Sequence, residues 1–216
     1  MIISGYGIEL IRLRREDIEL VREKRNSPEV QQFMEYREEI TPEMQVKWFE
    51  SVDTISNNYF IIRVNGEKVG LIYGSQIDWN KKETGNGGIF IWDTKWHESP
   101  LPLQATFILI ELTFLLGLER TFVKVLRDNS RAIRFNQDLG YRLADGQEDV
   151  INQTYVLSQS EYLRKTDRVR KALANQYSDV LTITFDQPEA EAELFLLQRL
   201  QQLNDVNSKR VILKQA

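Results

Sequence analysis

The sequence contains no cysteine and a single histidine, His97. Without thiols the chain can form neither disulfides nor thiolate metal sites, and it has no cysteine nucleophile. One imidazole likewise excludes a metal centre built from several histidines. A magnesium site made only of carboxylates stays compatible with the composition, but no motif predicts one. We therefore expect no metal site.

The chain also lacks a strong charge imbalance and a long apolar run. Its 28 basic and 32 acidic residues give a net charge of −4, so there is no general attraction to polyanions and we expect no nucleic-acid partner. The apolar segment 104–116 is much shorter than the ~20 residues that span a bilayer, and we expect no membrane association. The first residues do not show the basic-then-apolar order of a secretory signal, which favours a cytoplasmic location.

Hydrophobic periodicity and turn signals predict the elements of the first half. Alternation predicts a strand over residues 7–14, and helical spacing predicts a helix over 16–26. Thr41 followed by Pro42 is a strong start signal for a second helix. Residues 59–64 and 68–77 flank Asn65–Gly66, which predicts a hairpin on a type I′ turn.

Residues 88–141 form the stretch around which the chain is organised. We expect a central strand at 88–92, a buried helix at 104–116 and a strand at 121–126. Asp128 or Asn129 should cap a further helix, which Gly140 ends. Strand, helix and strand at this spacing predict a βαβ crossover with parallel strands.

The rest of the chain is predicted to complete the sheet and then add an extension. Strands are expected at residues 141–144 and 153–158, which closes a first domain of residues 1–159. Residues 160–216 show helix, strand, helix and strand patterns, at 162–177, 180–185, 189–203 and 210–213. They are too few to bury their own apolar faces, so they either cap the core or associate with a second copy of the chain.

Two segments carry a family resemblance. VLRDNSRAIRFNQDLGYRL resembles the closing motif of the Gcn5-related N-acetyltransferase (GNAT) superfamily, V-x-x-x-N-x-x-A-I-x-hydrophobic-x-x-x-x-G-aromatic. IELIRLRREDIELVREKRNSPEVQQFMEYREEITPEMQVKWFESV resembles the branch that acetylates nucleotide-linked amino sugars and protein N-termini. The resemblance covers roughly residues 6–158 in the family's order. It implies an α/β fold with a mixed, mostly antiparallel twisted sheet, a central parallel βαβ pair, and helices on both faces.

The resemblance implies an N-acetyltransferase that moves an acetyl group from acetyl-CoA to a small primary amine. In this family the amine attacks the thioester directly, so the protein must hold both molecules in line. A nucleotide-linked amino sugar is the first expected acceptor, and a protein N-terminus is the second. A non-catalytic binding or assembly module is the alternative from another class.

The resemblance places the cofactor along the central strand, the turn after it and the two following helix starts. The residues implied to bind the cofactor are Ile91, Trp92, His97, Ser99, Leu103, Gln104, Ala105, Asn129 and Ala132. Amides of the turn would face the pyrophosphate, helped by the positive end of the helix.

The acceptor pocket is implied to lie between the first two helices, with Arg25, Met34, Met44 and Trp48 facing it. Core packing is the ordinary alternative for Met44 and Trp48, which recur at helical spacing. Position 44 is commonly histidine in the sugar-acetylating branch, so Met44 favours a more apolar acceptor.

Three departures from the family pattern leave the catalytic residues unassigned. Pro100 and Pro102 stand where glycines are expected in the turn, Asn136 replaces the usual tyrosine acid, and Lys124 replaces a common glutamate. Proline has no N–H, so two amide donors to the pyrophosphate are lost, at a cost of ~3–6 kcal/mol. We therefore expect cofactor binding to be weakened or remodelled at this turn. His97 is more typical of a loop histidine than of a catalytic base.

Overall fold

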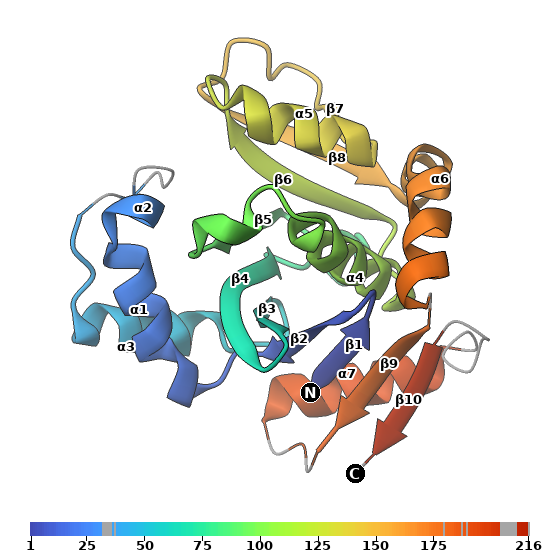
Figure 1. Cartoon of the computed structure of the whole chain (residues 1–216), viewed down its shortest axis with the longest axis horizontal. Helices are drawn as coiled ribbons and strands as arrows, with labels where there is room; N and C mark the ends of the chain where they lie inside the picture. Colours follow the sequence, from blue (N-terminus) through green and yellow to red (C-terminus); the bar gives the residue numbers. More distant parts are fainter. Residues whose placement is uncertain are drawn as a thin grey trace.

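The computed structural model describes residues 1–31, 36, 38–178, 180–186, 188, 190–203 and 211–215. Its strands are β1 (Ile2–Gly5), β2 (Ile8–Arg12), β3 (Asn58–Val64), β4 (Glu67–Ser75), β5 (Asn86–Ile91), β6 (Arg120–Leu126), β7 (Arg142–Leu143), β8 (Asn152–Ser158), β9 (Leu181–Phe185) and β10 (Val211–Gln215). Within the described residues they form a seven-stranded sheet of order β10-β9-β1-β2-β3-β4-β5 and a three-stranded sheet of order β6-β8-β7 (Figure 1). Pairing is antiparallel except between β10 and β9.

The helices cover both faces of the large sheet. They are α1 (Ile18–Asn26), α2 (Pro28–Gln31), α3 (Pro42–Val52), α4 (Leu101–Leu115), α5 (Ser130–Leu139), α6 (Gln159–Tyr177) and α7 (Glu191–Gln202), with short 3-10 turns at Arg15–Asp17 and Thr94–Trp96. The large core cluster contains α4 with one face of β1 to β4, whereas α1 and α3 pack on Ile61 and Leu71 of the other face. No helix in the described part of the chain is long and apolar enough to cross a membrane.

The first half largely follows its local sequence signals. Asn65 and Gly66 both have positive φ, 50° and 84°, which confirms the hairpin turn between β3 and β4. The Thr41 side chain accepts from the amide of Met44 and caps α3 as expected. The strand predicted at residues 7–14 is present as β2, and the sequence did not predict β1 before it; Tyr6 and Gly7 adopt positive φ and reverse the chain between the two strands.

The central unit has the predicted elements but not the predicted pairing along its whole length. β5 and β6 run parallel and meet only at their starts, where Thr84 N–H donates to the Arg120 carbonyl at 3.2 Å. Beyond this point they belong to different sheets and separate. α5 begins at Asn129, whose side chain accepts from Ala132 N–H at 3.0 Å, and it ends at Gly140 with φ 103°. The crossover therefore opens a gap between two strands that start together.

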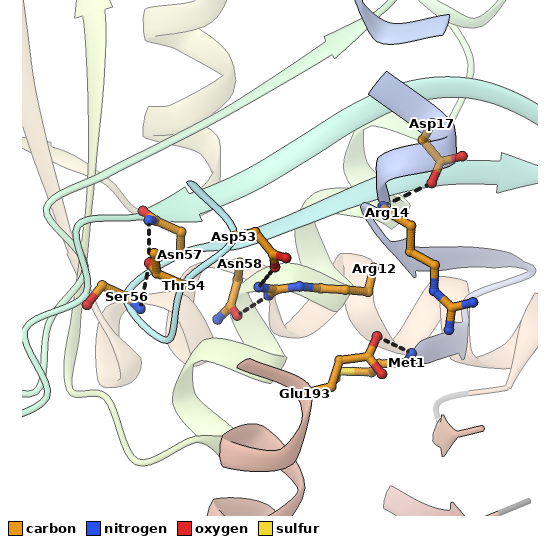
Figure 2. Close-up of polar contacts among 10 residues, drawn as sticks. All are labelled: Met1, Arg12, Arg14, Asp17, Asp53, Thr54, Ser56, Asn57, Asn58 and Glu193. Atoms are coloured by element: carbon orange, nitrogen blue, oxygen red, sulfur yellow. Dashed lines mark hydrogen bonds and ion pairs between the residues drawn. The ribbon is translucent and has the colours of Figure 1, made fainter. Parts of the chain in front are cut away.

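The C-terminal extension caps the core. β9 pairs with β1, β10 pairs with β9, and α7 brings apolar side chains such as Leu196 and Leu200 into the same cluster as β1 and α4. Figure 2 shows Glu193 of α7 accepting from the amino group of Met1 at 2.7 Å. The described part of the extension therefore shares one sheet and one core with the residues before it.

Arg12 forms a second buried polar contact close by (Figure 2). Its side chain is 4% exposed, donates to Asn58 Oδ1 at 3.0 Å, and lies 3.6 Å from Asp53. Burial lowers the pKa of Arg12, and the charge of Asp53 opposes that shift. The pair connects the end of β2 to the segment that leads from α3 into β3.

Candidate active site

The gap between β5 and β6 contains a cavity of about 480 Å³. β4 and β5 form one wall, β6 the other, and α4 and α5 close the remaining sides. The polar side chains that line the cavity are Tyr73, Asn86, Thr106, Thr113, Thr121, Lys124, Asn129, Asn136, Tyr141 and Asn152. Its inner end is closed where Thr84 and Thr121 share a hydrogen bond of 2.9 Å between their hydroxyls.

The backbone of β5 contributes hydrogen-bonding groups to this cavity. Trp92 N–H donates to the Val69 carbonyl at 3.1 Å, which fixes the alternation of the β4–β5 ladder. The amides of Gly87, Ile89 and Ile91 consequently point away from β4, towards β6. Since β6 has diverged, this edge of β5 is available to an extended ligand that enters the gap.

The turn after β5 uses most of its polar groups internally. The amides of Trp96, His97 and Ser99 donate to carbonyls of the same turn, and Leu101 N–H donates to Ser99 Oγ at 3.2 Å. His97 Nε2 lies 3.0 Å from the Ile91 carbonyl. From α5, Arg131 donates to the His97 carbonyl at 2.8 Å and closes the turn from outside. This arrangement leaves few amide donors for a phosphate.

The structure brings part of the predicted cofactor set to the cavity. Asn129 and Ala132 line it, and the Ile91 amide faces the gap. His97 and Ser99 lie in the turn beyond its mouth. Leu103 is partly buried against the core at the start of α4.

Three residues predicted to bind the cofactor are placed elsewhere. Gln104 is 5% exposed and donates to the Tyr6 carbonyl at 2.8 Å, so it ties α4 to the β1–β2 turn. Ala105, within α4, is fully buried. Trp92 uses its amide in the β4 ladder, and its indole N–H donates to the Lys68 carbonyl at 2.9 Å. Their side chains therefore face other neighbours, because a helix or strand orients successive side chains in different directions, and their part in cofactor binding stays a prediction.

On the other face of β4 and β5, four aromatic side chains pack side by side. We call Trp48, Tyr59, Tyr73 and Phe90 the aromatic face. Trp48 meets Tyr59 edge-on with ring centroids 5.4 Å apart, and Tyr59 stacks on Tyr73 at 4.8 Å. Tyr73 and Phe90 also line the cavity, so the aromatic face adjoins the gap between β5 and β6. Burial raises the pKa of Tyr59 to about 12.

Arg25, at the end of α1, reaches the aromatic face. Its Cζ atom lies 5.9 Å from the centre of the Phe90 ring, and its Nε atom is buried without a hydrogen-bond partner. Among the described residues, no carboxylate lies within ion-pair distance of its guanidinium. Burial lowers the pKa of Arg25, and proximity to Tyr73 and Tyr59 opposes that shift. Arg25 is thus a partly buried cation without a protein counter-ion in the described chain.

The structure places the residues predicted to bind the acceptor in different surroundings. Trp48 contacts Tyr59 and Arg25 lies over the Phe90 ring, so both reach the aromatic face. Met44 is 40% exposed on α3 and is not part of this packing, so its place in the pocket stays a prediction. Met34 lies outside the described residues.

Two positions that depart from the family pattern also lie at the cavity. Asn136 donates its side-chain N–H to the Ala132 carbonyl at 2.8 Å, within its own helix. Lys124 is exposed on β6 beside the cavity.

Sequence reasoning missed the aromatic face apart from Trp48. Tyr59, Tyr73 and Phe90 were assigned only to strands, although their face is set by the register Tyr59↔Tyr73 and Leu71↔Phe90. One local signal was present. Gly87 and Gly88 stand side by side in β5, and a Cβ at Gly88 would lie 2.8 Å from the Tyr73 hydroxyl. Two consecutive glycines inside a predicted strand indicate that another group approaches the backbone closely.

Comparison with known proteins agrees with this geometry. A family model described as the acetyltransferase (GNAT) domain matches residues 8–142, more than half of the 216-residue chain. Among solved structures, apo FdhC, a nucleotide-linked sugar GNAT, is 16% identical with a TM-score of 0.67, and the match covers 80% of this chain and 98% of that one. The match to spermidine N-acetyltransferase from Vibrio cholerae, in complex with CoA and spermine, is 18% identical with a TM-score of 0.59 and covers 74% and 99%.

A domain from Methanocaldococcus jannaschii DSM 2661 is similar too, at 20% identity and a TM-score of 0.61, with 70% of this chain and 97% of that one covered. No curated protein matches the chain. At these identities the structural matches establish the fold, and the family match establishes the family. The chain belongs to the GNAT acetyltransferase family.

Proposed function

We propose that the protein transfers the acetyl group of acetyl-CoA to a primary amine on a molecule that also carries an anionic group, with a nucleotide-linked amino sugar as the acceptor. The pantetheine arm would lie along the free edge of β5 in the cavity, where the amides of Ile89 and Ile91 point. The acceptor would approach from the aromatic face, on the other side of β5.

The guanidinium of Arg25, unpaired among the described residues, is the observation that indicates the class of acceptor. A guanidinium stays protonated in proteins, and burying a charge without a partner is costly. Arg25 has no carboxylate partner among the described residues, and its Nε atom is buried and unsatisfied. A phosphate or carboxylate on the acceptor would supply the missing counter-ion, because guanidinium groups bind both in a two-pronged geometry.

The aromatic face supports a nucleotide in particular. Flat aromatic side chains favour the stacking of a planar base, and each such contact contributes ~1–3 kcal/mol. Trp48 is the outermost ring of the Trp48–Tyr59–Tyr73 series and is only partly buried. It is therefore the ring we expect to contact the base.

The same site disfavours a polyamine. Spermidine carries several positive charges, and Arg25 would repel them across a short, partly desolvated distance. The likeness in fold to a spermidine N-acetyltransferase therefore does not by itself favour a polyamine acceptor.

The test is a panel of acceptors assayed by release of the CoA thiol. UDP- and dTDP-linked amino sugars, the free amino sugar, a peptide with a free N-terminus, and spermidine would each be offered with acetyl-CoA. We expect the nucleotide-linked sugars to have the highest kcat/KM. In Arg25→Ala, the KM for these acceptors should rise about 10- to 100-fold, since a hydrogen bond to a charged group contributes ~1.5–3 kcal/mol.

Lys47→Ala is the matched control, because it removes one positive charge from an exposed position on α3 next to Trp48. It should leave the KM of the acceptor within about threefold, the size expected for an exposed charge. Preference for spermidine, or equal KM values in Arg25→Ala and the wild type, would contradict the proposed acceptor. Absence of CoA release with every acceptor would favour a non-catalytic member of the family.

A further inference from the structure

Tyr73 is placed to touch both substrates of the proposed reaction. It lines the cavity between β5 and β6, and its ring belongs to the aromatic face next to Arg25. Its ring is held by the parallel stack on Tyr59, with 9° between the ring planes. Its hydroxyl lies over Gly88, where β5 has no side chain to cover it.

The other hydroxyls that line the cavity are already engaged within the protein or buried. Thr106 donates to the Pro102 carbonyl and Thr113 to the Leu109 carbonyl, both within α4, and Thr121 shares a hydrogen bond with Thr84 at the closed inner end. Tyr141 is only 5% exposed, whereas Tyr73 is partly exposed. These hydroxyls are therefore poorly placed to exchange a proton with a ligand.

The Tyr73 hydroxyl has a different environment. Its recorded polar partner is the side chain of Asn86, and the Oδ1 of Asn86 already accepts from Gly87 N–H at 2.9 Å. The contact with Asn86 opposes the rise of the Tyr73 pKa, which is the effect of a hydrogen bond donated to the Tyr73 oxygen. The proton of Tyr73 has no acceptor among the described residues, and it is available to a bound molecule.

We propose that Tyr73 is the catalytic acid that protonates the departing CoA thiolate. This assignment rests on the proposed function. The amine nitrogen bonds to the thioester carbonyl carbon, the carbon–sulfur bond breaks, and the sulfur takes the proton of Tyr73 together with that bond's electron pair. The new ammonium nitrogen loses one proton to water, and Tyr73 regains one from water, so the sum is amide plus CoA thiol.

The electrostatic surroundings agree with this role. Burial raises the pKa of Tyr73, so it keeps its proton at neutral pH. The nearby Arg25 charge opposes that shift and would stabilise the transient tyrosinate. Asn136, at the position where the family usually has a tyrosine acid, bonds to its own helix and has no proton of suitable acidity.

The test compares two acetyl donors in wild type and Tyr73→Phe, with the acceptor that the panel identifies. With acetyl-CoA, Tyr73→Phe should lower kcat about 10²- to 10³-fold, the usual contribution of a general acid. The KM for both substrates should change less than about threefold. With p-nitrophenyl acetate the leaving group is stable as an anion and needs no proton, so the variant should keep most of the wild-type rate.

Tyr59→Phe is the matched control, because it removes a hydroxyl from the neighbouring ring of the same stack. Any loss it causes should be equal for the two donors. Lys124→Met tests the exposed cation beside the cavity and should likewise show no donor dependence. Equal losses of Tyr73→Phe with both donors, a kcat with acetyl-CoA within threefold of wild type, or a donor-dependent loss in Lys124→Met instead would overturn the assignment.

The two proposals fail in different ways. If the wild type acetylates an amine that carries no anionic group, the acceptor class is wrong while the donor comparison still decides the role of Tyr73. If the wild type releases no CoA thiol with any acceptor, the reaction itself is refuted, and the role of Tyr73 with it.

Discussion

The turn after β5 and the aromatic face both adjoin β5, but they use their polar groups differently. In the turn, amides and side chains donate to one another, and Arg131 closes the turn from α5. The indole N–H of Trp96 is the exception, being buried without a partner among the described residues. On the aromatic face, Arg25 and the Tyr73 proton have no acceptor or counter-ion in the described protein.

This difference distinguishes polar groups that stabilise the fold from polar groups that we expect to bind a ligand. A polar group already satisfied within the protein must give up one hydrogen bond to make another, so it gains little by binding. A partly buried polar group without a partner destabilises the free protein, and a ligand that pairs with it removes this cost. Replacements in the turn and at the start of α5 should therefore change stability, whereas those on the aromatic face should change activity.

The largest expected effect comes from a methyl group at Gly88. In Gly88→Ala the new Cβ would lie 2.8 Å from the Tyr73 hydroxyl and 2.9 Å from its ring, so the ring must move. A displacement of this size at a reacting group costs about 100-fold. We expect kcat/KM to fall by about that factor, measured by release of the CoA thiol.

A double-mutant cycle with Tyr73→Phe isolates the cause. If Gly88→Ala acts by moving the Tyr73 hydroxyl, it should cost little more in a protein that already lacks that hydroxyl. Additive losses in the double variant would show that Gly88 acts through another neighbour.

Replacing Asn129 should have a smaller effect on activity, because this residue both stabilises the fold and lines the cavity. Its side chain caps α5, and loss of a cap costs about 1 kcal/mol, or ~2–4 °C in Tm for a domain of this size. It also lines the cavity. Asn129→Ala should therefore lower both the Tm and the affinity for acetyl-CoA, measured by differential scanning calorimetry and titration calorimetry.

Asn129→Ser is the matched control, because serine caps a helix about as well as asparagine. It should keep the wild-type Tm while the affinity for acetyl-CoA still falls. A serine variant with wild-type affinity would restrict Asn129 to its capping role.

The sequence was sufficient where a few neighbouring residues decide the structure. The Asn65–Gly66 turn and the α5 helix from its Asn129 cap to Gly140 follow from local backbone preferences, and both are confirmed. The family resemblance also predicts that Arg25 and Trp48 share a site; in the structure Trp48 contacts Tyr59, and Arg25 lies near Tyr59 and Tyr73.

Features that depend on distant neighbours could not be predicted in this way. The resemblance places Gln104 at a helix start that faces the cofactor, whereas the structure shows its side chain donating to the carbonyl of Tyr6, 98 residues away. Tyr59, Tyr73 and Phe90 lie side by side because of the register between β3, β4 and β5. The alternation of apolar and polar residues within each strand does not determine that register. The gap between β5 and β6 likewise depends on their pairing with different sheets.

The smallest expected effect concerns the two prolines of the turn. Pro100 and Pro102 lie at the start of α4, where the missing N–H groups would not be used by the helix itself. Pro100→Gly/Pro102→Gly would add two amides near the expected pyrophosphate. One hydrogen bond to a charged group contributes ~1.5 kcal/mol, but ordering two glycines at a helix start costs a similar amount. The other amides of the turn stay bonded to Thr94, Trp96 and Ser99. We therefore expect the affinity for acetyl-CoA, measured by titration calorimetry, to rise no more than about threefold. A gain of 100-fold or more would show that the prolines alone weaken the site, and that the internal bonds of the turn yield readily to a phosphate.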